Sequence, residues 1–120
     1  MAKILTVDDS KAIRDLMVHI LESANHEVTT AEDGVQALAT ARTESFDLLL
    51  IDVNMPNMGG LSLVNKLRRM ENYQYVPMIM VTTETSDYKK NKAKTMGATG
   101  WLTKPFTAER LLGAVNKVSG

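Results

Sequence analysis

Short apolar runs alternate with helical patterns along the chain, and this alternation constrains the fold more than any other feature. The apolar runs occupy residues 4–7, 28–31, 48–51, 78–81 and 101–102. The third run, Leu48-Leu49-Leu50-Ile51, is apolar at every position, which is typical of a strand buried on both faces. Five strand–helix alternations in so short a chain predict an α/β protein, with a parallel sheet between two layers of helices.

Apolar stripes at a spacing of three or four residues predict four of the five helices. The stripes are Ile13, Met17, Ile20, Leu21 and Ala24; Val35, Leu38 and Ala41; Leu61, Val64, Leu67 and Met70; and Leu111, Leu112, Val115 and Val118. Predicted N-caps are Ser10, Asp33, Ser86 and Thr107, whereas Gly59 and Gly60 lead into the third helix.

The fourth helix is predicted from its ends, Ser86 at the start and Gly97 at the stop. It carries Lys89, Lys90, Lys92 and Lys94 but few large apolar groups. We therefore expect a solvated helix. The alternative is a loosely packed element that is available for contact with a partner.

Composition restricts the classes of function. The 120 residues suit one domain, spanning 1–120, and the formal net charge of zero argues against a partner that is nucleic acid or acidic membrane. The chain contains no cysteine, which excludes disulfides and thiolate chemistry. We see no signal peptide and no apolar segment long enough to span a bilayer, so we expect a cytoplasmic protein.

Polar residues follow four of the predicted strands. Asp8 and Asp9 follow the first, Asp52 the third, Thr82 the fourth, and Lys104 lies just beyond the fifth. Parallel strands end at the same edge of a sheet, so these side chains should converge there. Three close carboxylates repel one another, and Lys104 together with a hard cation would compensate them. Because the ligands that these residues offer are oxygen atoms, we expect the cation to be Mg²⁺.

Two histidines stand apart from this set. His19 lies in the first helical pattern and His26 precedes the second strand. With no cysteine and no histidine cluster, nothing points to zinc. We predict that both are ordinary surface residues.

Longer motifs identify a family. They are VDDS at 7–10, DVNMPNMGG at 52–60, MVTTE at 80–84, GATGWLTKPF at 97–106 and LLGAVNKV at 111–118. Together they span almost the whole chain, which resembles the receiver domain of response regulators and, in detail, the CheY-like chemotaxis regulators. The resemblance implies a flavodoxin-like (βα)5 fold with the strand order 2-1-3-4-5.

The resemblance also implies a role for each residue at the strand ends. Asp52 matches the phosphoacceptor, Asp9 the direct Mg²⁺ ligand and Asp8 a ligand that acts through water. The backbone carbonyl of Asn54 matches a further metal ligand. Thr82 resembles the hydroxyl that bonds one phosphoryl oxygen, and Lys104 the lysine that pairs with another.

Further residues match family positions that orient the side chains of this site or modulate its chemistry. Pro105 matches a family proline that often follows a cis peptide bond. Trp101 occupies the family's aromatic switch position, where it would respond to Thr82. The alternative for Trp101 is a half-buried packing residue. Glu84 matches a position that influences hydrolysis and phosphatase recognition, as does Asn54.

Two residues depart from the family's usual pattern. Gly59 stands where Asp is common, which should alter the loop and loosen the helix start. Thr83 replaces a small Ala or Gly, and its bulk should slow hydrolysis of the acyl phosphate.

The resemblance implies a phosphoacceptor signalling protein, which is not an enzyme acting on a separate substrate. Its partners would be a CheA-like sensor histidine kinase and a downstream target such as a flagellar motor switch component, with a possible phosphatase. We expect a monomer with no output domain. The alternatives are a phosphorelay shuttle and an adaptor that works without phosphorylation. A flavodoxin-like electron carrier would need a phosphate loop where Asp8 and Asp9 stand, and a dehalogenase-type phosphatase would need a DxD pattern there.

Overall fold

A computed structural model describes residues 1–119, and these residues form one five-stranded parallel sheet with five α-helices. The strands are β1 (Lys3–Val7), β2 (Glu27–Ala31), β3 (Leu48–Ile51), β4 (Met78–Thr82) and β5 (Gly100–Thr103). Their order is β2-β1-β3-β4-β5, and every neighbouring pair is parallel. The predicted flavodoxin-like fold and strand order are confirmed.

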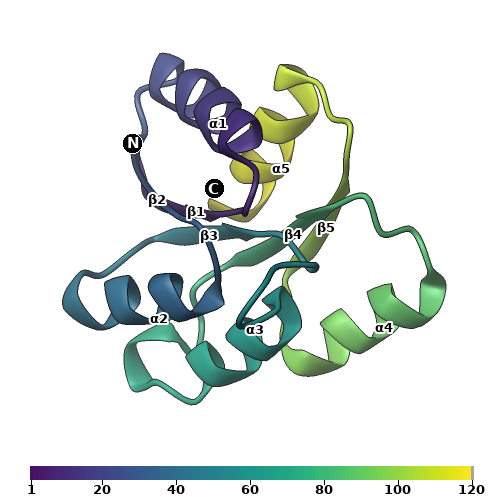
Figure 1. The fold of residues 1–120 in the computed structure, drawn as a ribbon. Coiled ribbons are helices and arrows are strands. Elements are labelled where there is room, and N and C mark those ends of the chain that lie inside the picture. Colours follow the sequence, from purple (N-terminus) through teal and green to yellow (C-terminus); the bar gives the residue numbers. More distant parts are fainter. Residues whose placement is uncertain (120) are drawn as a thin grey trace.

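The helices connect successive strands and cover both faces of the sheet. They are α1 (Lys11–Ser23), α2 (Gly34–Thr43), α3 (Gly60–Arg68), α4 (Asp87–Met96) and α5 (Ala108–Ser119), with a 3₁₀ turn η1 (Glu71–Tyr73) after α3. Figure 1 shows α1 and α5 on one face and α2, α3 and α4 on the other. Within residues 1–119, no helix is both long enough and apolar enough to cross a membrane.

The two faces of the sheet bury separate cores, because successive strand residues point in opposite directions. In β3, Leu48 and Leu50 join the core under α1 and α5, whereas Leu49 and Ile51 join the core under α2, α3 and α4. All four are fully buried, which explains why this strand is apolar at every position.

The predicted helix ends are confirmed. The side chains of Ser10, Asp33, Ser86 and Thr107 accept hydrogen bonds from backbone N–H groups three residues later. Gly97 has a φ of 110°, the left-handed conformation expected just after a helix. Gly59 precedes α3 without a side-chain cap, so the helix lacks the hydrogen bond that an Asp could supply there.

One of the predicted apolar stripes is partly wrong, and another is incomplete. Val35 is 52% exposed, because Gly34, Ala37, Leu38 and Ala41 form the face of α2 that meets the core. In α3 the buried face contains Leu63, which the predicted stripe omits. The error in α2 is a rotation of the face by about one residue in a short helix, where few turns define it. In α3 the predicted residues all contact the core, and the prediction only omits Leu63.

The fourth helix is only lightly packed, as its composition predicts. Ala93 is its one buried residue among those that the structure describes. Its C-terminal end is held by Arg68, whose guanidinium donates hydrogen bonds to the Gly97 carbonyl at 2.8 and 3.0 Å. The same guanidinium donates to the carbonyls of Tyr73 and Val76. One end of α4 is therefore fixed, whereas most of its length is exposed.

The histidines differ from each other. His19 is exposed, as predicted. His26 is half-buried, and its Nδ1 accepts a hydrogen bond from the Ala2 N–H at 3.1 Å. His26 therefore binds the backbone just before β1, and the prediction of an ordinary surface residue is wrong for this histidine.

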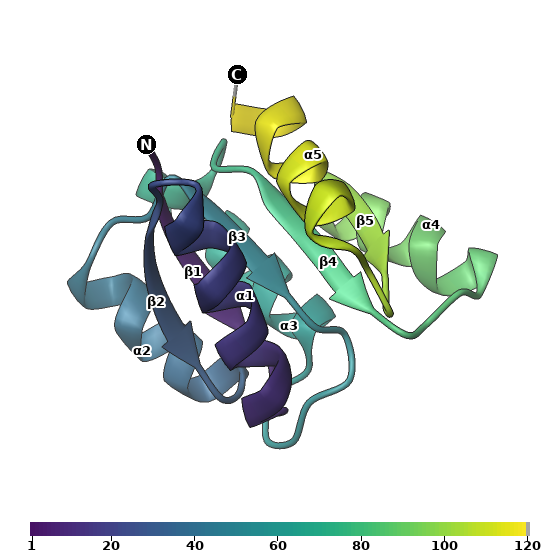
Figure 2. The ribbon, with the colours of Figure 1, turned by 90° about the horizontal axis from the view of Figure 1, so that it is seen from above.

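All five strands run in the same direction, so their carboxyl ends lie along one edge of the sheet. Figure 2 shows the strand arrows pointing toward the edge where α1 begins. The predicted strand-end residues are thereby brought to one place.

Candidate functional site

The acidic residues after β1 lie in two different environments. Asp8 is 1% exposed, and its N–H donates to the Ala31 carbonyl at the end of β2 at 3.1 Å. Its carboxylate accepts from the Ser10 N–H at 2.9 Å and from the Lys104 ammonium. Asp9 is exposed. The turn therefore holds one carboxylate inside the site and presents the next one to solvent.

Asp52 follows β3 and is buried beside Asp8. Burial raises the pKa of the Asp52 carboxyl above its ordinary value of 3.8, and the positive charge of Lys104 opposes this rise. The negative charge of Asp8 raises the pKa further, whereas hydrogen bonding by Thr82 and Lys104 lowers it. Without a bound metal ion, the ionised form of Asp52 is therefore less favoured than in a freely solvated aspartate.

Oxygen atoms of Asp8, Asp9 and Asp52 all lie within 4.8 Å of one another. Carboxylate oxygens in this number fit a hard divalent cation such as Mg²⁺, which would relieve their mutual repulsion. The Asn54 residue is exposed in the loop after Asp52. Its predicted role as a carbonyl ligand remains a prediction.

Lys104 and Thr82 complete the site from β5 and β4. The Lys104 Nζ lies 3.4 Å from Oδ2 of Asp52, and its side chain is only 11% exposed. The Lys104 N–H donates to the Thr82 carbonyl at 2.8 Å, which joins the ends of the two strands. The Lys104–Pro105 peptide bond is cis, as the resemblance predicts. Pro105 itself is exposed.

The loop after Thr82 contains two of the predicted modulating residues, Thr83 and Glu84. The buried Thr82 hydroxyl accepts from the Glu84 N–H at 3.2 Å, and the Glu84 carboxylate accepts from the Ser86 N–H at 3.2 Å. Thr83 is exposed. The loop thus links the Thr82 hydroxyl to the residue that caps α4.

Trp101 lies in β5, apart from the acidic group, and packs against the core on the α4 face. It is half-buried, and its indole Nε1 is buried without a hydrogen-bond partner among residues 1–119. A groove of about 290 Å³ borders it, lined also by Lys90, Ala93 and Ala98. The Lys90 ammonium lies 6.0 Å from the centre of the ring. The ring is therefore a packing residue in this structure, with space beside it.

Sequence reasoning missed the residues that surround the acidic group. Arg14 donates a hydrogen bond to the Asp8 carbonyl at 2.8 Å, and Asn57 donates one to Asp33 at 2.8 Å. Gly60 allows α3 to begin against Asp52, because a Cβ there would lie 2.0 Å from the Asp52 carbonyl oxygen. A glycine pair before a helix signals such a close approach, whereas nothing in the sequence marks Arg14.

Comparison with known proteins extends these observations. Residues 4–116 match the family described as Response regulator receiver domain. The chain is 37% identical over 118 residues to Protein PilH of Pseudomonas aeruginosa, with 98% of each protein covered. It is 38% identical over 120 residues to a Chemotaxis protein CheY homolog of Campylobacter jejuni, which covers 98% of this chain and 92% of that protein.

A solved structure agrees with these relatives. The chemotaxis response regulator CheY4 of Vibrio cholerae matches with a TM-score of 0.95 and 49% sequence identity, over 98% of each chain. Receiver domains in general bind Mg²⁺, and the acidic group at the strand ends is compatible with that property. The match over nearly the full length, together with the shared fold, shows that this chain belongs to the receiver domain family of response regulators.

Proposed function

We propose that this protein accepts a phosphoryl group on Asp52, in a Mg²⁺-dependent reaction, from the phosphohistidine of a sensor histidine kinase. The observation that carries the proposal is the position of Lys104, whose Nζ lies 3.4 Å from Asp52 Oδ2 beside the group formed by Asp8, Asp9 and Asp52. A buried nucleophile, a cation and a cluster of metal-type ligands are the components that phosphoryl transfer requires.

The proposed Mg²⁺ ligands differ in accessibility. Asp9 is exposed and would bind the ion directly, whereas Asp8 is held by Ser10 and Lys104 and would act through water. One Asp52 oxygen and the Asn54 carbonyl would complete the protein ligands. Bound Mg²⁺ would neutralise the negative charge of these carboxylates and of the phosphoryl oxygens.

The reaction requires little covalent chemistry from the protein. An Asp52 carboxylate oxygen attacks phosphorus, a phosphorus–oxygen bond forms, and the phosphorus–nitrogen bond to the donor histidine breaks. The donor imidazole leaves with the electron pair of that bond. Lys104 stabilises charge on one phosphoryl oxygen, and the Thr82 hydroxyl donates to another.

The signal would pass from Thr82 to Trp101 and α4. Phosphorylation adds up to about two negative charges at Asp52. A shift of the Thr82 hydroxyl toward them would give up its bond from the Glu84 N–H and free the loop before α4. The buried Nε1 of Trp101, which lacks a hydrogen-bond partner among residues 1–119, and the light packing of α4 support a change of conformer on this face.

The partners follow from the family and from the names of the relatives. A CheA-like histidine kinase would act upstream, and a flagellar motor switch component downstream, because several relatives are chemotaxis proteins. A phosphatase would reset the signal. We expect a cytoplasmic monomer in which residues 1–120 act as one receiver domain, and no nucleic acid partner, since the net charge is zero.

Incubation with acetyl phosphate and Mg²⁺, followed by intact mass measurement, tests the proposal. We expect the mass of one phosphoryl group to be added in the native protein, and none in Asp52→Asn or in the presence of a chelator. A native protein that stays unmodified at high phosphodonor and Mg²⁺ concentrations would instead support the adaptor that works without phosphorylation.

A further inference from the structure

Glu32 and Asp33 connect β2 to α2, which begins at Gly34, and we call these three residues the β2–α2 turn. The proposed chemistry uses none of them. β2 is the edge strand beside β1, and the turn has links to the two loops that carry the proposed metal ligands, namely the one after β1 and the one after β3. Two hydrogen bonds join it to the loop after β3, whereas its link to the loop after β1 is an ion pair with Arg14.

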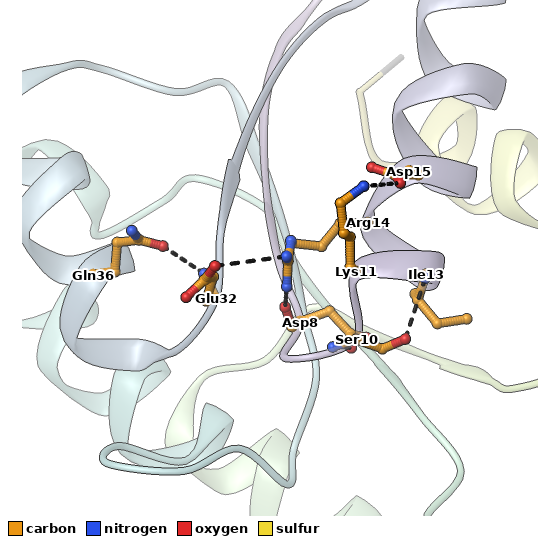
Figure 3. Close-up of polar contacts among 8 residues, drawn as sticks. All are labelled: Asp8, Ser10, Lys11, Ile13, Arg14, Asp15, Glu32 and Gln36. Carbon is orange, nitrogen blue, oxygen red and sulfur yellow. Dashed lines mark hydrogen bonds and ion pairs between the residues drawn. The ribbon is translucent and has the colours of Figure 1, made fainter.

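The turn is first held by its own helix. The Asp33 carboxylate accepts from the Gln36 N–H at 2.8 Å, and the Gln36 side chain in return accepts from the Glu32 N–H at 2.6 Å. Figure 3 shows Gln36 reaching back to Glu32 in this way. This reciprocal pair of hydrogen bonds satisfies backbone N–H groups on both sides of the helix start and thereby fixes the conformation of the turn.

Arg14 connects the turn to the loop after β1. Its guanidinium lies between Glu32 and Asp8, as Figure 3 shows. It donates to the Asp8 backbone carbonyl at 2.8 Å, and its second terminal nitrogen lies 3.7 Å from the Glu32 carboxylate. The Arg14 side chain is 13% exposed. The hydrogen bond from Arg14 holds the backbone of the residue that directly precedes Asp9, and the ion pair joins Arg14 to the Glu32 side chain, which is 68% exposed.

Asn57 connects the turn to the loop after β3. The Asn57 amide donates to the second carboxylate oxygen of Asp33 at 2.8 Å, and the Gly34 N–H donates to the Met58 carbonyl at 3.2 Å. The hydrogen bonds from Gln36 and Asn57 lower the pKa of Asp33. Asn57 has a φ of 67°, a left-handed conformation that Asn tolerates better than most residues.

We propose that the β2–α2 turn positions the metal ligands of both loops, and that the contact between Asp33 and Asn57 is its principal link to the loop after Asp52. This inference rests on the proposed Mg²⁺ site. Asp33 and Asn57 are positioning residues, because neither belongs to the acidic group. When their contact is lost, the loop populates other conformers, and the apparent Mg²⁺ affinity falls with the fraction that remains competent.

A double-mutant cycle with Mg²⁺ titration calorimetry tests this inference. Asn57→Gly removes the amide without changing charge, and glycine accepts the positive φ without strain. Asp33→Ser keeps a residue suited to the N-cap of α2 and removes the oxygen that Asn57 contacts. We expect Asn57→Gly to weaken Mg²⁺ binding by about threefold or more in the native background, and to have almost no effect in the Asp33→Ser background.

The cycle and its control separate the loss of positioning from the loss of a negative charge and from the general effect of replacing asparagine by glycine. Asp33→Ser removes a negative charge, but this loss is shared by the single variant Asp33→Ser and the double variant. It therefore cancels when the effect of Asn57→Gly is measured in that background. Asn25→Gly is the matched control, because Asn25 also has a positive φ, of 68°, and lies between α1 and β2, at the other end of that strand. It should leave Mg²⁺ affinity unchanged. Urea unfolding in chelator shows that each variant is folded.

The possible failures are distinguishable. A native protein that binds no Mg²⁺ would overturn the proposed function, and this inference with it. Native binding that Asn57→Gly leaves unchanged would overturn the inference alone. Equal weakening by Asn57→Gly in both backgrounds would also overturn it, because Asp33 would then not be the partner through which Asn57 acts.

Discussion

The ammonium of Lys104 lies 3.4 Å from a carboxylate oxygen of Asp52 and also donates a hydrogen bond to Asp8. One cation therefore compensates two buried carboxylates. The remaining negative charge, together with burial, keeps the pKa of Asp52 raised. The site is therefore suited to bind a second cation. Removing negative charge from the site should stabilise the metal-free fold, whereas removing the positive charge of Lys104 should slow phosphorylation.

Replacing Lys104 should slow phosphorylation. We expect Lys104→Met to lower the rate of modification by acetyl phosphate by at least about tenfold, because the charge that offsets a phosphoryl oxygen is lost. A time course of intact masses at saturating Mg²⁺ measures this rate. Lys90→Met is the control, since that cation lies on α4 beside Trp101 and should leave the rate unchanged. Equal rates for Lys104→Met and the native protein would contradict the proposed role.

Replacing Asp52 should stabilise the metal-free fold. A raised carboxyl pKa means that the folded protein holds the proton more tightly than the unfolded chain does, so stability falls as pH rises from 3.8 through the raised value. An amide carries no charge at any pH. In chelator at neutral pH, we expect Asp52→Asn to increase the free energy of unfolding by about 1 kcal/mol.

Urea unfolding at several pH values measures this difference. It should shrink well below pH 3.8, where both side chains are neutral. It should also shrink in saturating Mg²⁺, which stabilises the native protein by binding its folded state. A variant that is no more stable than the native protein at neutral pH in chelator would show that Asp52 is not destabilising.

Gly60 should be intolerant of any side chain. A Cβ at this position would lie 2.0 Å from the Asp52 carbonyl oxygen, so α3 would have to move away from the end of β3. We expect Gly60→Ala to cost at least about 2 kcal/mol of unfolding free energy. Gly113→Ala is the matched control in α5, where a Cβ would meet nothing within 4 Å, and it should stabilise by about 0.5–1 kcal/mol. Similar effects of the two substitutions would refute the close approach.

Thr83 should protect the phosphorylated state. It is exposed and directly follows the buried Thr82. We predict that its bulk hinders water that approaches the acyl phosphate. We expect the native protein to lose its phosphoryl group more slowly than Thr83→Ala after the phosphodonor is removed. Intact mass measured over time reports the loss, and an equal or faster loss from the native protein would contradict this role.

Trp101 should report activation. The Nε1 atom of its indole is buried without a hydrogen-bond partner among residues 1–119, and a groove lies beside the ring, so a change of conformer would alter its surroundings. We expect the fluorescence of this single tryptophan to change when beryllofluoride and Mg²⁺ are added together. Mg²⁺ alone and the Asp52→Asn variant serve as controls. An unchanged spectrum at saturation would leave Trp101 as a packing residue only.

Much of the fold could be predicted from local patterns. The caps at Ser10, Asp33 and Ser86 were correct, because capping is decided by a side chain and the N–H groups a few residues away. The buried face of α2 was not, because Val35 and Ala37 both fit a short apolar stripe. Contact with the sheet selects between them, and the local sequence does not contain that contact.

The residues of the candidate site also divide into those that the local sequence predicts and those that only the tertiary structure identifies. The sequence by itself determined which residues end the strands, since each apolar run stops at a polar residue such as Asp8, Asp52 or Thr82. It could not show that Arg14 lies 3.7 Å from the Glu32 carboxylate or that Asn57 donates a hydrogen bond to Asp33. Those contacts join segments that only the order of strands in the sheet brings together. Local periodicity determines the elements, whereas long-range packing decides which side chains support the chemistry.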